Sequence, residues 1–104
     1  NLIHNAIQAM PSGGEININA HYQPGNHMIQ VTIADTGIGI PQESVQKIFE
    51  PFYTTKQTGT GLGLSIVKKK LEEMDATIHV ENNGEKGVSF VLNFPLIEPI
   101  LTQF

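Results

Sequence analysis

The spacing of apolar positions predicts a helix at the start of the chain. In residues 1–10 the apolar side chains recur every three or four positions, and Pro11-Ser-Gly-Gly14 then predicts the end of the helix. A helix that begins at the first residue has no capping residue before it, so we expect that the chain lacks an upstream segment. The face expected to be buried consists of Leu2, Ile3, Ala6, Ile7 and Met10.

Two pairs of alternating segments predict two β-hairpins. Residues 15–22 and 28–34 alternate between apolar and polar positions around a turn at Pro24-Gly-Asn26, and residues 76–82 and 88–94 do the same around Asn83-Gly84. In each hairpin the apolar positions share one face, which we expect to be buried. The inner positions are Ile16, Ile18, Ala20 and Tyr22 in the first hairpin, with Ile29, Val31 and Ile33, and Phe90, Leu92 and Phe94 in the second.

Helical patterns lie between the hairpins. Pro41 and Glu43 indicate the start of a short helix that runs to about Phe49. A longer amphipathic helix is predicted by apolar residues at Leu64, Val67, Leu71 and Met74, with Lys68, Lys69, Lys70, Glu72 and Glu73 on its solvent side. Residues 96–104 carry apolar side chains without a clear pattern and are left unassigned. The predicted class is α+β, an antiparallel sheet with helices on one face.

Composition limits the range of functions. A chain of 104 residues with 39% hydrophobic and 15% charged residues is typical of one soluble globular domain. We find no apolar run long enough to cross a bilayer and no cleavable leader, so we expect a cytosolic or cytosol-facing location. The net charge of −4 argues against nucleic-acid binding, and the absence of cysteine excludes disulfides and thiolate metal sites.

Residues 49–63 have the composition of a ligand-binding loop. An aromatic start that contains proline leads to Lys56 and then to three alternating glycines, Gly59, Gly61 and Gly63. Such glycines allow the backbone N–H groups to converge, and the helix that follows directs its positive end to the same point, which favours phosphate. Alternate glycines are also common in ordinary flexible loops, so this motif alone leaves both interpretations open.

Four polar residues are candidates for chemistry. Asn1 and Asn5 share one helix face and could supply an amide oxygen to a hard cation, or could simply be solvated. Asp35 ends an apolar strand before glycines, as a turn residue or as an acceptor for an exocyclic amine. Lys56 could hold terminal phosphates or be solvated. No metal-ligand spacing relates the histidines His4, His21, His27 and His79, which we interpret as structural or surface residues.

The order of these features resembles a known family, the ATP-binding catalytic domain of bacterial sensor histidine kinases, within the superfamily that includes gyrase, Hsp90-type chaperones and MutL. Residues 1–10 resemble its N box, and Asp35-Thr-Gly-Ile-Gly39 resembles its G1 box. Phe49-Glu-Pro-Phe52 resembles the F box, and Gly59-Thr-Gly-Leu-Gly63-Leu the G2 box. The first and third motifs are most similar to the nitrogen-regulation and sporulation-kinase branch. The resemblance covers roughly residues 1–95.

The resemblance implies a site for ATP and Mg²⁺. Asn5 would ligate magnesium, and Asn1 would lie by the phosphates where ATPases of the superfamily place a catalytic acid. Asparagine cannot act as a base, which favours phosphoryl transfer over hydrolysis. Asp35 would hold the adenine amino group. The other implied positions are Gly37 and Gly39 at the purine, Phe49 and Phe52 as anchors of the ATP lid, Lys56, Thr60, Gly61 and Gly63 at the phosphates, and Leu62 among the nucleotide-binding residues, with Asn1, Asn5 and Lys56 as the catalytic set.

The implied fold is the Bergerat fold, a two-layer α/β sandwich with an antiparallel or mixed sheet. We expect one domain over residues 1–95, followed by a tail over 96–104. Family members also carry a strand and helical segment upstream, and a dimerisation and phosphoacceptor domain before that. We therefore expect an unpaired sheet edge here, and a chain that binds ATP without phosphorylating itself.

The implied whole protein is a homodimeric sensor kinase, either cytoplasmic or with this domain on the cytoplasmic side of a membrane-bound sensor. It would transfer the γ-phosphoryl group of ATP to a histidine on the dimerisation domain, and from there to a response-regulator aspartate. We expect no contact of this domain with nucleic acid or membrane. The alternatives are a serine kinase of the anti-sigma-factor type, a nucleotide-binding regulatory module without transfer, and a scaffold that binds no nucleotide.

Overall fold

The computed structural model describes residues 2–53, 63–83 and 86–96. None of the helices in these ranges is long and apolar enough to cross a bilayer. Both predicted hairpins and both longer helices are present, with ends within two residues of those expected, so the α+β class is confirmed. The elements in chain order are α1 (Leu2–Gln8), β1 (Ile16–Gln23), β2 (Met28–Asp35), the 3₁₀ helix η1 (Gln42–Ser44), α2 (Gly63–Glu73), β3 (Thr77–Asn82) and β4 (Val88–Pro95).

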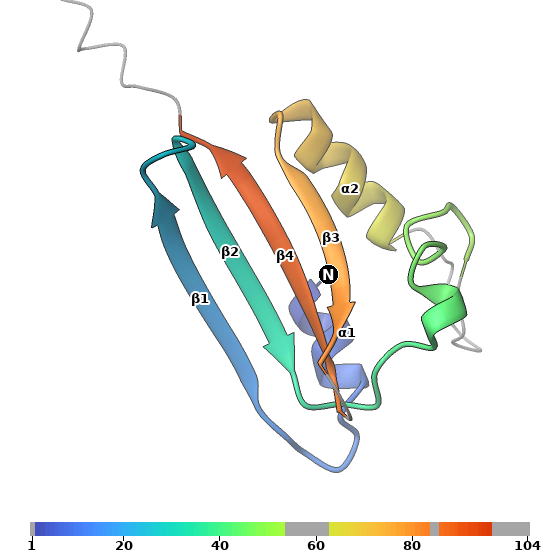
Figure 1. Cartoon of the computed structure of the whole chain (residues 1–104). Coiled ribbons are helices and arrows are strands. Elements are labelled where there is room, and N and C mark those ends of the chain that lie inside the picture. The colour runs from blue at the N-terminus through green and yellow to red at the C-terminus, as the bar shows by residue number, and fades with distance from the viewer. Residues whose placement is uncertain (1, 54–62, 84–85, 97–104) are drawn as a thin grey trace, which may run out of the picture.

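The four strands form one antiparallel sheet in the order β1-β2-β4-β3 (Figure 1). Each hairpin pairs internally, and the pairing of β2 with β4 joins the two hairpins. In this register Ile18 lies opposite Ile33, Ile33 opposite Phe90, and Phe90 opposite Val80. Directly opposed residues point to the same side of a sheet, so the two apolar faces predicted from the alternation merge into one.

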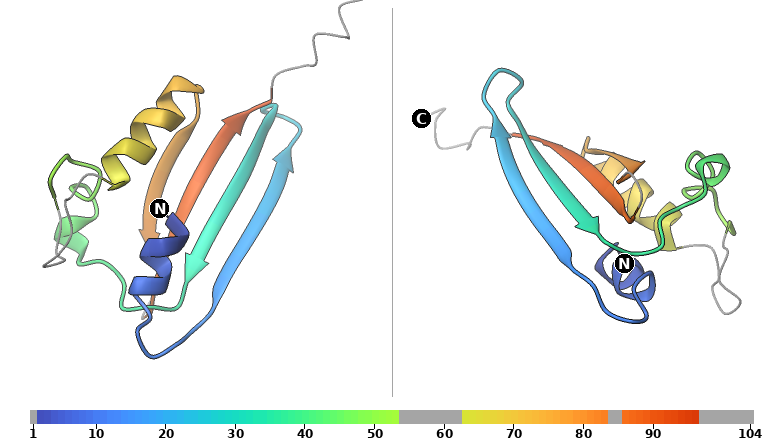
Figure 2. Two further views of the ribbon diagram at one scale, coloured as in Figure 1. Left: turned by 180° about the vertical axis from the view of Figure 1, so that it is seen from behind. Right: turned by 60° about the horizontal axis from the view of Figure 1, so that its bottom comes forward.

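The core lies between this apolar face and the two helices. Leu71 of α2 packs against the strands, and Leu2 of α1 contacts the same cluster of side chains. Figure 2 shows α1 and α2 on the same side of the sheet. Burial of this cluster is the main source of stability, because each aliphatic or aromatic side chain removed from water contributes about 1.5–3 kcal/mol. The buried members are Ile48, Leu71, Ala76, Val80, Val88, Phe90 and Leu92.

The predicted burial of the apolar face of the first hairpin is wrong for β1. Ile18 of β1 is 55% exposed and Tyr22 is 48% exposed. Within the described part of the chain the helices lie over the other strands and leave β1 uncovered, as the left view of Figure 2 shows. Alternation correctly identifies which side chains share a face, but burial of that face also needs a second layer over the strand.

The predicted buried faces of the two helices are wrong in part. In α1 the buried residue is Ala6, whereas Ile3 and Ile7 are about half exposed. In α2 Leu71 is buried, but Met74 lies beyond the last helical residue and is 56% exposed. The predicted solvent side of α2, with its lysines and glutamates, is confirmed as exposed. Each helix meets the sheet along a stripe narrower than its whole apolar arc.

The short helix predicted from Pro41 to about Phe49 is also wrong in its length. Only η1 is helical, and single turns follow it, in which the amides of Lys47 and Ile48 both donate to the carbonyl of Ser44. A short isolated helix is marginal because its first turn is unfavourable to form. Ile48 of this segment is 7% exposed and packs in the core, and Val45 and Phe49 contact the same cluster. The predicted turn residue Gly84 and residues 97–104 lie outside the described ranges.

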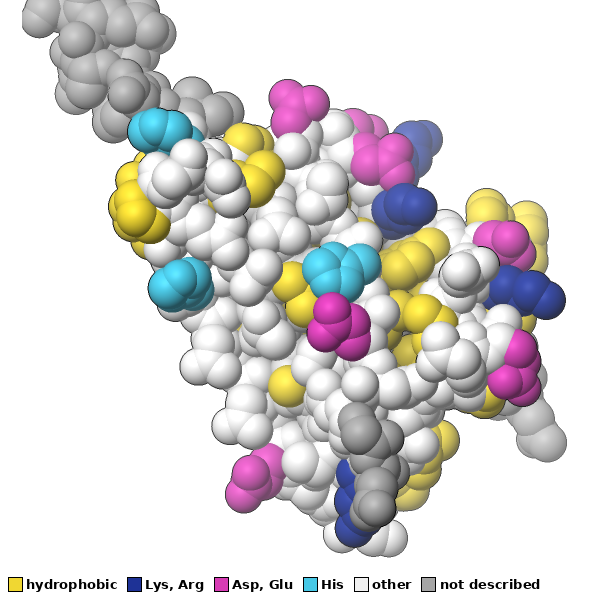
Figure 3. Space-filling model, viewed as in Figure 1, with side chains coloured by type: hydrophobic (Ala, Val, Ile, Leu, Met, Phe, Trp, Pro, Cys, Tyr) yellow, Lys and Arg dark blue, Asp and Glu magenta, His cyan; other side chains and the backbone are white. Residues whose placement is uncertain are grey.

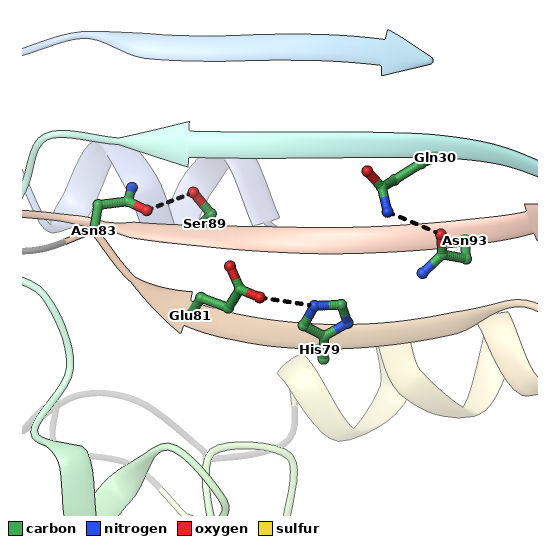
Figure 4. Close-up of polar contacts among 6 residues, drawn as sticks. All are labelled: Gln30, His79, Glu81, Asn83, Ser89 and Asn93. Carbon is green, nitrogen blue, oxygen red and sulfur yellow. Dashed lines mark hydrogen bonds and ion pairs between the residues drawn. The ribbon is translucent and has the colours of Figure 1, made fainter. Parts of the chain in front are cut away.

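The second face of the sheet is polar. Over the strands, Figure 3 shows a surface that is mostly neither hydrophobic nor charged. Hydrogen bonds connect its side chains in pairs (Figure 4): Gln30 donates to Asn93 at 3.2 Å, and Ser89 donates to Asn83 at 2.8 Å. His79 contacts Glu81 at 3.3 Å on the same face. The face is polar at most positions, although Ser89 and Val91 of β4 are buried on it.

Candidate functional site

Asp35 is the most deeply buried charged residue of the described chain, at 4% exposure, and it is the last residue of β2. Its Oδ1 atom accepts a hydrogen bond from the Gly37 amide at 2.9 Å and a longer one from the Val88 amide at 3.4 Å. The first bond is an Asx-type turn, so the side chain has the local role expected of a turn aspartate. Both bonds end on Oδ1. The second carboxylate oxygen, Oδ2, is therefore the atom that could accept a hydrogen bond from a ligand.

The end of α1 holds the loop that follows Asp35. The Ile38 amide donates to the carbonyl of Ala9 at 3.2 Å. A Cβ atom added to Gly37 would lie 2.5 Å from the same carbonyl oxygen, so this position has no room for a side chain. Thr36 adds a contact with Met10 through its hydroxyl, at 3.5 Å from the sulfur. The structure therefore brings the predicted N box and G1 box together, although more than twenty residues separate them in the sequence.

Gly87 completes the surroundings of Asp35, although no pattern in the sequence singles it out. Its φ angle is +81°, and a Cβ atom added there would lie 1.9 Å from the carbonyl oxygen of Asp35. No L side chain is compatible with that approach. The glycine comes just before β4 and is easily interpreted as an ordinary turn residue, so only the pairing of β2 with β4 reveals its role.

Asn82, the last residue of β3, is a second residue that no sequence pattern singles out. Its Oδ1 accepts from the Ile40 amide at 3.0 Å, and its Nδ2 donates to the Ile40 carbonyl at 2.8 Å. An open depression of about 530 Å³ lies over this contact. It is lined by Ile38, Gly39, Ile40, Pro41, Gln42, Asn82, Lys86 and Gly87.

Asn5 lies on α1 and is half-buried, four residues before the Ala9 carbonyl that holds the loop after Asp35. Asn5 interacts with another group of the protein, so it has a partner in the structure. Its amide oxygen is of the type that hard cations such as Mg²⁺ accept as a ligand, which makes Asn5 chemically compatible with the predicted metal role. Asn1, predicted to lie by the phosphates, is outside the described ranges.

The two F-box phenylalanines have different environments. Phe49 packs edge-on against Phe90, with ring centroids 6.3 Å apart and planes at 80°. The Nζ atom of Lys68, on α2, lies over the Phe49 ring at 5.6 Å from its centroid. Phe52 is 72% exposed and has a φ of +69°, which is uncommon for a residue with a side chain. Next to it, the Tyr53 hydroxyl donates to Ser44 at 2.5 Å. Phe49 and Tyr53 thus attach the start of the predicted lid to the core.

The predicted phosphate-binding residues are only partly described. Gly63 is the first residue of α2, as expected for a glycine that leads into a helix. Lys56, Thr60, Gly61 and Leu62 lie outside the described ranges, so their predicted positions at the phosphates stay predictions. The geometry on the described side therefore consists of Asp35, the loop after it, and the end of α1.

Comparison with known proteins agrees with these motifs. Residues 1–98 match the family model described as histidine kinase-, DNA gyrase B- and HSP90-like ATPase. The chain is 43% identical over 95 residues to sporulation kinase A of Bacillus subtilis (strain 168), a match that covers 91% of this chain and 15% of that protein. The chain thus spans about one seventh of that relative.

Solved structures give the same result. The catalytic domain of histidine kinase ThkA superposes with a TM-score of 0.78 at 40% identity, over 90% of this chain and 60% of that one. ThkA in complex with the response regulator protein TrrA gives a TM-score of 0.75 at 36% identity, over 93% of this chain and 27% of that one. The fold predicted from the resemblance is thereby confirmed.

Proposed function

The chain belongs to the family of histidine kinase-, DNA gyrase B- and HSP90-like ATPases, and we propose that it is the Mg-ATP-binding catalytic part of a sensor histidine kinase. In the complete protein the γ-phosphoryl group would pass to a histidine on a dimerisation domain, and from there to a response regulator. The relatives support this, since sporulation kinase A and ThkA carry kinase names and ThkA has been solved with a response regulator.

The observation that carries the proposal is the contact of the end of the N-box helix with the G1 loop that directly follows Asp35. A carboxylate that is 4% exposed needs polar partners, and this one has backbone donors on one oxygen. The exocyclic amine of adenine would supply a donor to Oδ2. Gly37 and Gly39 would shape the purine pocket, and the close approach of Gly37 to the Ala9 carbonyl would hold the loop against the N-box helix.

The remaining residues would bind the other parts of the nucleotide. Asn5 would hold Mg²⁺, which neutralises phosphate charge when it is bound. Lys56 and the glycines of the G2 box would contact the phosphates through one cation and converging amides. Phe49 would anchor the lid by its contact with Phe90. The chemistry would consist mainly of positioning the γ-phosphoryl group for an acceptor on another domain.

Calorimetric titration of Mg-ATP tests the proposal, with the fold of each variant checked by circular dichroism. Asp35→Asn replaces the proposed acceptor by an amide that can direct N–H groups at the adenine amine. A hydrogen bond to a charged group contributes about 1.5–3 kcal/mol, so we expect affinity to fall about 10- to 150-fold. Asp75→Asn is the matched control, because it removes the same charge at an exposed position next to the end of α2.

Each result has a clear meaning. Binding by the wild type and by Asp75→Asn, with a large loss in folded Asp35→Asn, supports the site and the role of Asp35. Equal binding by all three proteins removes Asp35 from the site. A folded wild type that releases no heat contradicts nucleotide binding by this chain. Transfer to a serine of a supplied partner, instead of a histidine, would favour the anti-sigma-factor type of kinase.

A further inference from the structure

The side-chain amide of Asn82 makes a two-point contact with the main chain of Ile40. The Ile40 N–H donates to Oδ1 at 3.0 Å and the Ile40 carbonyl accepts from Nδ2 at 2.8 Å. An asparagine amide has one acceptor and two donors, so it can satisfy both main-chain groups of one residue at once. The two bonds resemble the pair of main-chain bonds that a neighbouring strand would form with one residue. Here the side chain at the end of β3 supplies them.

The contact holds a segment that otherwise has considerable freedom. Gly39, immediately before Ile40, has a φ of +80°, and its nearest neighbours are Asn82 and Gly87 at 3.4 Å or more from the position of an added Cβ atom. Glycine adopts positive and negative φ with similar ease, so local preference does not fix this peptide. On its other side the same loop is held by the bond from Ile38 to the carbonyl of Ala9. The loop is therefore attached at one end to α1 and at the other to β3.

We propose that Asn82 is a positioning residue for nucleotide binding, which keeps the Gly39–Ile40 peptide in the conformation that receives the purine. This inference rests on the proposed function, because that function places Gly39 beside the adenine base. Asn82 acts through Ile40 and makes no contact with the nucleotide in this proposal. Its effect is to populate the binding-competent loop before the ligand arrives.

The expected effect is a smaller population of the binding-competent loop. Each hydrogen bond contributes modestly, and without both of them the loop samples other conformations, so the apparent dissociation constant rises by the inverse of the competent fraction. A competent fraction of about 0.1–0.2 after loss of the contact corresponds to an affinity about five- to tenfold lower. Mg-ADP and Mg-ATP should lose affinity by the same factor, because both carry the same base.

The test compares Asn82→Ala with Asn83→Ala in the full chain, by calorimetric titration of Mg-ADP and Mg-ATP and by thermal unfolding. Asn83 is a matched control, because its side chain accepts a hydrogen bond from Ser89 in the same hairpin, whereas the bonds to Ile40 come from Asn82. Asn82→Ser, which is too short to span both groups, replaces Asn82→Ala if that variant does not fold. Amide exchange at Ile40, measured by NMR, reports on the contact without any ligand.

We expect Asn82→Ala to bind both nucleotides five- to tenfold more weakly and to exchange the Ile40 amide faster, with Asn83→Ala within about twofold of the wild type. Equal affinity in Asn82→Ala and the wild type would overturn the inference while leaving the proposed function intact. An equal loss in Asn82→Ala and Asn83→Ala would also overturn it, because general loosening of the hairpin would then explain both. A wild type that binds neither nucleotide would refute the proposed function, and this inference with it.

Discussion

Replacing Gly87 by alanine is the sharpest test of how the sheet surrounds Asp35. The added Cβ atom would lie 1.9 Å from the carbonyl oxygen of Asp35 and 2.7 Å from its carbonyl carbon. Both atoms belong to the backbone of β2, so no side-chain rotation relieves the contact. β2 and the segment before β4 would have to separate by about 1 Å or more, since Cβ contacts below 3.0 Å are essentially never found.

Two effects add in this variant. A φ of +81° is unfavourable for alanine by about 1–2 kcal/mol. Forcing extra volume against packed atoms costs typically about 1–3 kcal/mol. We therefore expect Gly87→Ala to lower the free energy of unfolding by about 2–5 kcal/mol, a large part of the stability of a small domain. The moved carbonyl belongs to Asp35, so nucleotide affinity should fall as well.

Two other glycines separate the effects. Gly13 has a φ of +95° and Gly25 has no positive φ, and an added Cβ atom at either position meets nothing within 4 Å. Urea denaturation should show a loss of about 1–2 kcal/mol for Gly13→Ala and none for Gly25→Ala. If Gly87→Ala is no less stable than Gly13→Ala, the close approach of Gly87 to Asp35 does not exist and the account of the site is wrong.

The remaining predictions concern packing and phosphorylation. Phe49→Leu should lower the free energy of unfolding in urea by about 1 kcal/mol through loss of the edge-on ring contact, whereas Phe52→Leu should change it by less than about 0.5 kcal/mol; equal effects would contradict the different packing of the two rings. Leu71→Ala should lower the melting temperature by an amount equivalent to about 2–4 kcal/mol, while Met74→Ala should leave it nearly unchanged; a large effect at Met74 would show that the helix buries the face predicted from its sequence. After incubation of the chain with Mg-ATP, mass spectrometry should find no phosphohistidine at any of the four histidines, and its detection there would contradict the prediction that the acceptor lies on another domain.

Local pattern was sufficient to predict the four strands and the two longer helices, but not the length of the short helix after Pro41. The alternation in residues 28–34 identified β2, and the glycines and prolines around each segment indicated where it ends, because turn geometry depends on neighbouring residues. The order of four short motifs was sufficient to identify the family, and Asp35 was recognised as the polar end of an apolar strand. These features depend on residues close together in the sequence.

Burial was predicted less well, for a physical reason. The apolar residues Ile18 and Tyr22 were assigned to the correct face of β1, yet they are exposed, because no described element lies over that strand. Met74 follows the helical period of α2, yet it is exposed beyond the end of the helix. A periodic pattern identifies the side of an element, whereas the neighbouring layer decides whether that side is covered.

The sequence by itself determined the four strands and two longer helices, the class of the fold, the family and the residue type at the centre of the site. Only the tertiary structure decided what surrounds Asp35. Val88, 53 residues away, donates to its carboxylate, and Asn82, 42 residues from Ile40, holds the loop that follows it. Both contacts exist because β4 pairs with β2 on one side and with β3 on the other. That pairing depends on the burial of the whole apolar face, which no short stretch of sequence specifies.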